Sequence, residues 1–111
     1  MEAATTTISP AGMPQHMRAL AHANEIRLAR AALKRSIAAG DEQAAAVVRG
    51  CPREAATMSV GELLRSQRRW GRTRSRKFLI SLALNENRQL SRLTERQRGV
   101  LAAELETKRR R

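Results

Sequence analysis

The chain has 111 residues, enough for one modest hydrophobic core, and its 22 Lys+Arg against 10 Asp+Glu give a formal net charge of +12. This charge exceeds what solubility requires and predicts an extended anionic partner, with nucleic acid favoured over acidic lipid. The single cysteine, Cys51, excludes an intramolecular disulfide and favours a reducing, intracellular setting. His16 and His22 have no thiol or carboxylate cluster nearby and no stretch approaches ~20 apolar residues, so we expect no metal, no cofactor and no membrane partner.

Residues 1–14 mix threonine, serine, proline and glycine without helical periodicity, which is typical of a flexible arm. From Gln15 to Ala39 the chain contains no Pro or Gly and repeats apolar side chains at helical spacing, at Ile26, Ala29, Leu33 and Ile37. This pattern predicts the longest helix. A neighbouring face carries basic residues at the same spacing, Arg27, Arg30 and Lys34, which either follow a phosphate backbone or are ordinary solvated charges.

Two short helices are predicted next. Gly40 stands where a helix C-cap is expected, and Asp41 is placed to cap a second helix that continues through Val48. Gly50 and Pro52 then stop it. Residues 59–62, Ser-Val-Gly-Glu, have the spacing of a capping box and predict a third helix that ends near Gln67.

The densest positive segment follows, with no acidic residue from 65 to 77. Its seven basic residues surround the dipeptide Trp70-Gly71; they are Arg65, Arg68, Arg69, Arg72, Arg74, Arg76 and Lys77. We expect a tight turn over residues 68–73, in which Gly71 adopts a positive φ. Helical spacing resumes from Thr73 to Leu84. Trp70 either packs two helices together beside the turn or inserts against sugars and bases.

A helix that begins directly after a glycine turn predicts a phosphate site. Its first N–H groups lack internal partners, and the helix dipole adds positive potential. Gly71 removes the side chain that would hold a phosphate away, and Thr73 is a plausible N-cap. Donors beside these amides come from Arg72, Thr73 and Arg74. The extended candidate surface adds Arg68, Arg69, Trp70, Arg76 and Lys77. Because such donors recognise the backbone, we expect little sequence preference.

The last third is also read as helical. Residues 85–87 break the pattern, Thr94 to Gln97 offer another capping box, and a final helix carries Val100, Leu101 and Leu105. Residues 108–111 are expected to form a frayed basic tail. No segment alternates with a period of two, so an all-α fold is predicted. No nucleophile–base pairing or phosphate loop is present, and catalysis is not expected.

Residues 60–101 resemble the actinobacterial (mycobacterial and streptomycete) integration host factor. The shared positions are Val60, Leu63, Leu64, Gly71, Arg72, Arg74, Leu82, Arg88, Leu90, Leu93, the run Arg96-Gln97-Arg98, and Leu101. Residues 17–38 are similar to the long first helix of that family. Two positions depart from the pattern: Arg68 stands where proline is expected, and Trp70 where a smaller aliphatic residue is expected. These departures would suit a diverged or phage-encoded copy.

The resemblance implies a single small domain at residues 15–107, with a long N-terminal helix packed on a helix-two-turns-helix element at about 60–105. It implies a monomeric, cytoplasmic, nucleoid-associated protein of a bacterial cell. Such a protein binds double-stranded DNA through phosphates with low sequence specificity, bends or organises it, and assists recombination by a phage integrase or alongside host nucleoid proteins. Residues 71–74 would be the phosphate-binding turn, and Arg27, Arg30 and Lys34 a second DNA-facing surface.

Two other functions stay open. A ribosomal protein uses the same element, so an RNA-binding module is one alternative, since a phosphate site accepts either backbone. The other is a small helical protein whose charge is directed at an acidic surface of a host protein. Some DNA repair glycosylases also use this element, with a catalytic residue at the N-terminus. That activity is disfavoured here, because residues 1 and 2 open the expected arm and nothing forms a base pocket.

Overall fold

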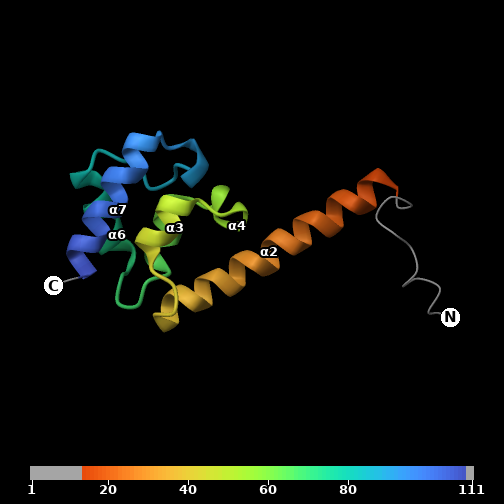
Figure 1. The fold of residues 1–111 in the computed structure, drawn as a ribbon, viewed down its shortest axis with the longest axis horizontal. Coiled ribbons are helices and arrows are strands. Elements are labelled where there is room, and N and C mark those ends of the chain that lie inside the picture. Colours follow the sequence, from red (N-terminus) through yellow and green to blue (C-terminus); the bar gives the residue numbers. More distant parts are fainter. Residues whose placement is uncertain (1–13, 110–111) are drawn as a thin grey trace.

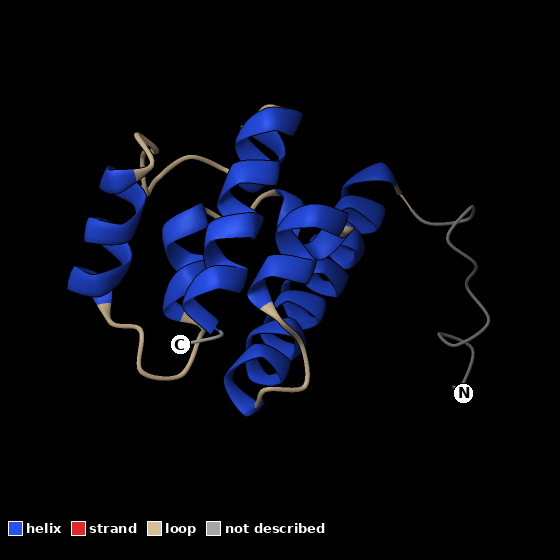
Figure 2. Cartoon of the chain, turned by 60° about the vertical axis from the view of Figure 1, so that its left-hand side comes forward, coloured by secondary structure: helices blue, strands red, loops and turns tan. Residues whose placement is uncertain are grey.

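The computed structural model describes residues 14–109, and the regular structure in that range is helical apart from one isolated β-bridge (Figure 2). The elements in chain order are α2 (Gln15–Ala39), α3 (Ala44–Gly50), α4 (Arg53–Ala56), α5 (Val60–Arg65), α6 (Arg72–Ser81), the 3₁₀ helix η2 (Leu90–Arg92) and α7 (Glu95–Arg109). The predicted all-α fold is therefore confirmed. The predicted arm at residues 1–14 lies, except for Pro14, outside the described residues.

Helix α2 has the bounds that its sequence predicts. Gly40 ends it in the left-handed conformation, with φ 86°, as a C-cap glycine does. Its buried side chains, Leu33 and Ile37, lie in its C-terminal part. The N-terminal part extends away from the other helices, which gives the molecule dimensions of 56 × 27 × 22 Å (Figure 1). Within residues 14–109, no helix has the length and apolar character needed to cross a membrane.

The second helix differs from its prediction at both ends. The N–H groups of Asp41 and Glu42 both donate to the carbonyl oxygen of Ser36, at 2.9 and 3.2 Å. These bonds hold both residues in the exit turn of α2, so Asp41 does not cap α3, which begins only at Ala44. At the other end Gly50 remains helical, and Cys51 adopts the left-handed conformation instead, with φ 42°.

The core lies between α3, α5, α6 and α7. It is built mainly from aliphatic side chains, including Val47, Val48, Leu63, Leu64, Leu79, Leu101 and Leu105, with Phe78. Helices α3 and α7 pack against each other over much of their length. At the edge of this contact the Arg49 Nη2 atom donates to Glu106 Oε1 at 2.8 Å, and this bond raises the pKa of the Arg49 guanidinium above its usual value.

The segment after α6 returns along the start of α5 and fixes the orientation of both. Three backbone bonds of 2.9 Å join the two segments: Gly61 N–H to Glu86 O, Val60 N–H to Arg88 O, and Leu90 N–H to Met58 O. Helix α6 stops before this segment, because Ala83 adopts the left-handed conformation, with φ 58°. The predicted helix to Leu84 is thus shortened to Ser81.

Both predicted capping boxes occur, one in full and one in half. At α7 the Thr94 N–H donates to Gln97 Oε1 at 2.9 Å, and the Gln97 N–H donates to Thr94 Oγ1 at 3.1 Å. At α5 the Ser59 Oγ accepts from the Glu62 N–H at 3.1 Å, but the Glu62 carboxylate pairs with Lys34 of α2. Helix α5 ends at Arg65, two residues before the predicted Gln67.

Helix α7 also corrects the predicted tail. It extends to Arg109, so Lys108 and Arg109 form its last turn, and two of the four residues assigned to an irregular tail are helical. Two basic side chains at a helix C-terminus are favoured by the helix dipole. Residues 110 and 111 lie outside the described residues.

Candidate nucleic-acid interface

The turn between α5 and α6 closes earlier than its sequence suggests. The Trp70 N–H donates to the carbonyl oxygen of Gln67 at 3.2 Å, which closes a four-residue turn. The third position of such a turn is the one that takes positive φ in a type II geometry, and here it is Arg69, with φ 70°. Gly71 has φ −88° and ψ −175°, which is extended backbone. The prediction of a positive φ at Gly71 was therefore wrong.

The N-terminus of α6 is nevertheless open, as predicted. Gly71 is its N-cap, and the first helical bond runs from Ser75 N–H to Gly71 O at 3.0 Å. The N–H groups of the three residues between them, 72 to 74, therefore have no acceptor within the helix. Thr73 lies inside the helix and is not the N-cap, since the earlier turn moves the helix start to Arg72.

Gly71 leaves space in front of these amides. A Cβ atom at this position would meet no described heavy atom within 4 Å. The residue is exposed, and so are its three successors, Arg72, Thr73 and Arg74. The space in front of the helix start is thus open, and the role of Gly71 in the approach of a phosphate stays a prediction, whereas the predicted backbone conformation was wrong.

The basic residues of the segment fall into two groups. Glu86 takes up part of the charge, because its carboxylate accepts from Arg76 Nε at 2.9 Å and lies 4.0 Å from Arg65 Nη1. The other group consists of exposed side chains without an ion pair to any residue from 14 to 109: Arg68, Arg69, Arg72, Arg74 and Lys77. Within this segment, the charge without an ion pair thus lies on the turn and on the first two turns of α6.

Trp70 packs, and it also supports a cation. Its ring meets that of Phe78 edge to face, with centroids 5.2 Å apart and planes at 86°. The Arg74 guanidinium carbon lies 4.3 Å from the Trp70 ring centroid. Half-buried against the core, Trp70 joins the turn to α6, as the packing interpretation predicts, while its predicted contact with DNA stays untested.

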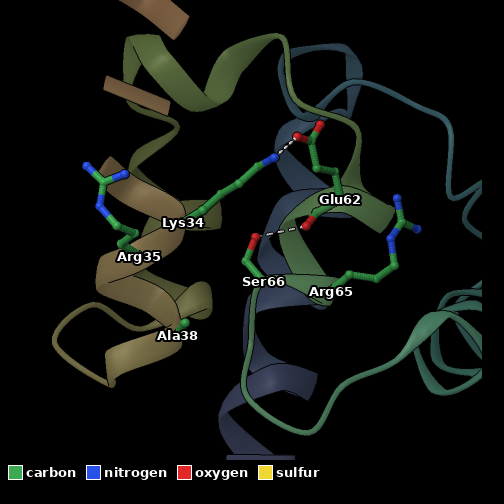
Figure 3. Close-up of a pocket in the computed structure, with 6 residues that line it drawn as sticks. All are labelled: Lys34, Arg35, Ala38, Glu62, Arg65 and Ser66. Atoms are coloured by element: carbon green, nitrogen blue, oxygen red, sulfur yellow. Dashed lines mark hydrogen bonds and ion pairs between the residues drawn. The ribbon is translucent and has the colours of Figure 1, made fainter. Parts of the chain in front are cut away.

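Of the three α2 residues predicted to face DNA, Arg30 and Lys34 are engaged by other helices of the domain. Arg30 Nε donates to the carbonyl oxygen of Glu54 at 3.3 Å, and its Nη2 contacts Thr57 Oγ1. Lys34 reaches from α2 to the Glu62 carboxylate of α5, beside a hollow of about 550 Å³ (Figure 3). Two of the three predicted DNA-facing side chains therefore hold α2 against α4 and α5, and the third, Arg27, is exposed.

Sequence reasoning missed two residues beside the turn. Glu104 and Lys108 of α7 line a cavity of about 640 Å³ together with Trp70, Thr73, Arg74, Lys77, Phe78 and Ser81. They lie about thirty residues further along the chain and reach this place only because α7 packs beside α6. No local pattern marks them. Residues 14–109 contain no group of three side chains suited to hold a metal ion.

Comparisons with known proteins add a shared fold. No protein-family model and no curated protein sequence matches the chain. Its structure is similar to that of sIHF, solved bound to an 8 bp palindromic DNA, with a TM-score of 0.68 and 23% sequence identity. The similarity covers 76% of this chain and 97% of the sIHF chain. The two proteins therefore have the same all-helical architecture.

Proposed function

We propose that this chain binds double-stranded DNA through its phosphates, at the turn and at the N-terminus of α6. The observation that carries the proposal is the set of amides at residues 72–74, which have no acceptor within the helix, follow an exposed glycine and stand among guanidinium groups without ion pairs. Main-chain donors, helix dipole and arginine charge there favour the same ligand, an oxyanion. The DNA-bound state of the structurally similar sIHF supports the choice of duplex DNA.

The finer role follows from the kind of donors present. Guanidinium and amide groups directed at phosphates read shape and charge, so sequence preference is low. In this proposal the segment from α5 to α7 acts as a helix-two-turns-helix element. The protein organises or bends DNA as an integration-host-factor-like, nucleoid-associated protein, and assists site-specific recombination. Its role is binding and not catalysis.

A pair of charge-matched variants tests the location of the site. Arg72→Glu reverses a charge at the α6 N-terminus, whereas Arg53→Glu makes the same change on α4, where the side chain contacts His22. Retention of a duplex in a gel-shift assay should fall strongly for Arg72→Glu and little for Arg53→Glu, with the helical circular dichroism signal kept in both. Equal losses would show that only net charge matters, and would place no site at the turn.

A salt titration and a competition complete the test. If about 6 phosphates are neutralised, the logarithm of affinity falls against the logarithm of salt concentration with a slope of about −5. The Arg72→Glu slope should be smaller in magnitude by about 1. Duplex RNA of the same sequence should compete weakly, since it requires contacts to 2′-hydroxyls. Preferential competition by RNA would overturn the assignment to DNA.

A further inference from the structure

The cavity between α6 and α7 has a lining that the phosphate site does not use. Trp70 and Phe78, nearly perpendicular to each other, are its aromatic components, and Arg74 lies over the Trp70 ring. Its volume of about 640 Å³ is in the range of pockets that take small ligands. Aromatic rings and guanidinium planes are the surfaces on which unstacked nucleobases stack.

The charged residues around the cavity suit the other parts of a nucleotide, its flanking phosphates and the polar edge of its base. Lys77 of α6 and Lys108 of α7 are exposed cations in its lining, suited to the phosphates on either side of a nucleotide. Glu104 is the acidic residue of the lining, and it forms no ion pair with any described residue. A carboxylate accepts hydrogen bonds from the exocyclic amino group of cytosine, which thymine lacks.

The cavity and the phosphate site share residues. Thr73 and Arg74 belong to the open N-terminus of α6 and also line the cavity. A phosphate held at the amides of residues 72–74 therefore places an adjoining nucleotide at the mouth of the cavity. A base within an intact duplex presents only its edges, so the occupant has to be a base that has left the stack.

We propose that this cavity binds one unpaired nucleobase of a DNA held at the α6 N-terminus, with a preference for cytosine over thymine. The inference rests on the proposed DNA binding and adds a recognition site for distorted or bulged duplexes. The Arg74 guanidinium, which lies over the Trp70 ring, supplies the stacking surface, the two lysines contact the flanking phosphates, and Glu104 accepts from the base amino group.

Four hairpin DNAs with the same stem test this proposal: an intact stem, and stems bearing a single bulged cytosine, thymine or abasic residue. Trp70 is the only tryptophan of the chain, so its fluorescence reports directly on the cavity. The cytosine bulge should bind about fivefold more tightly than the abasic bulge, since base–aromatic stacking contributes at least that much. It should also quench the fluorescence more than the abasic bulge does. The hairpin with the thymine bulge should bind less tightly than the one with the cytosine bulge.

The outcomes separate this inference from the proposed function. If the protein retains the intact stem but binds the cytosine and abasic bulges equally, it recognises flexible DNA, and the nucleobase site is overturned while DNA binding stands. If no hairpin is retained, the proposed function fails as well. Equal quenching by the abasic and cytosine bulges would place the contact on the backbone and would also overturn the site.

Two isosteric variants then locate the base contact. Glu104→Gln should bring the ratio of cytosine to thymine affinity towards one, because an amide no longer offers a charged acceptor. Glu95→Gln makes the same charge change at the start of α7, outside the cavity, and should keep the ratio. A ratio that survives Glu104→Gln would remove Glu104 from the site. Each ratio is measured within one variant, so a general change in affinity cancels.

Discussion

The Gly61 N–H donates to the carbonyl oxygen of Glu86 at 2.9 Å, and a Cβ atom built on Gly61 would lie equally close, 2.9 Å, to that same oxygen. The glycine is thus required by a close approach of two backbones, since its φ is not positive. This contact joins the first turn of α5 to the segment that follows α6. It therefore sets how the two helices on either side of the basic turn are held.

Gly61→Ala should lower the free energy of unfolding by about 1–3 kcal/mol, because the added methyl group overpacks this contact. Thermal or urea unfolding followed by circular dichroism measures the change. Gly99→Ala is the matched control: Gly99 lies inside α7, where a Cβ would meet nothing within 4 Å. There the alanine should stabilise by about 0.5–1 kcal/mol. A neutral Gly61→Ala would show that residues 85–88 move away freely.

Ala83→Gly should stabilise the protein. Ala83 holds φ 58°, and its position lets the Leu84 N–H donate to Leu79 O at 2.9 Å at the end of α6. The left-handed conformation costs alanine about 1–2 kcal/mol, from which the greater unfolded-state entropy of glycine, about 0.4–1 kcal/mol, must be subtracted. We expect a gain of about 0.5 kcal/mol in urea unfolding. Ala103→Gly, on the exposed face of α7, should cost about as much instead. Destabilisation by both variants would contradict the strain at Ala83.

Glu86→Gln should tighten DNA binding at low salt. The Glu86 carboxylate pairs with Arg76 and lies 4.0 Å from Arg65, so the amide would release positive charge beside the turn. One unit of charge about 10 Å from a phosphate contributes about 0.4 kcal/mol in water, which is roughly a twofold change in affinity. Because salt screens this interaction, the gain should disappear near 1 M salt. A gain that persists at high salt would point to rearranged contacts and not to released charge.

Local signals in the sequence predicted the local features of the structure. The run of residues without Pro or Gly, ended by Gly40, gave the bounds of α2, and the spacing from Thr94 to Gln97 gave a complete capping box. Both rest on interactions within a few residues of the chain. The open N-terminus of α6 followed from the same kind of reasoning, because a helix start always leaves its first amides without internal acceptors.

Features that depend on distant partners could not be predicted in this way. Whether Lys34 faces DNA or a carboxylate depends on Glu62, and Arg30 bonds to residues 24 and 27 positions away. The predicted conformation of the turn was wrong for a different reason. A glycine in a turn suggests positive φ, but closing the turn at Trp70 moved that conformation to Arg69. Glu104 lies beside Trp70 and Arg74 only because α7 packs against α6.

The two ends of helix α2 are stabilised in different ways. Near its C-terminus Leu33 and Ile37 are anchored in the core, whereas Met17, Leu20 and Leu28 are exposed by 47%, 65% and 62%. His22 contacts Arg53, and Arg30 bonds to Glu54 and Thr57, so only the turns before His22 depend mainly on alanine-rich helix propensity, which is marginal for a segment of that length in water. The cooperatively stabilised part of the domain therefore begins part-way along this helix. We expect these first turns to unwind and re-form without disturbing the turn that we propose to hold DNA.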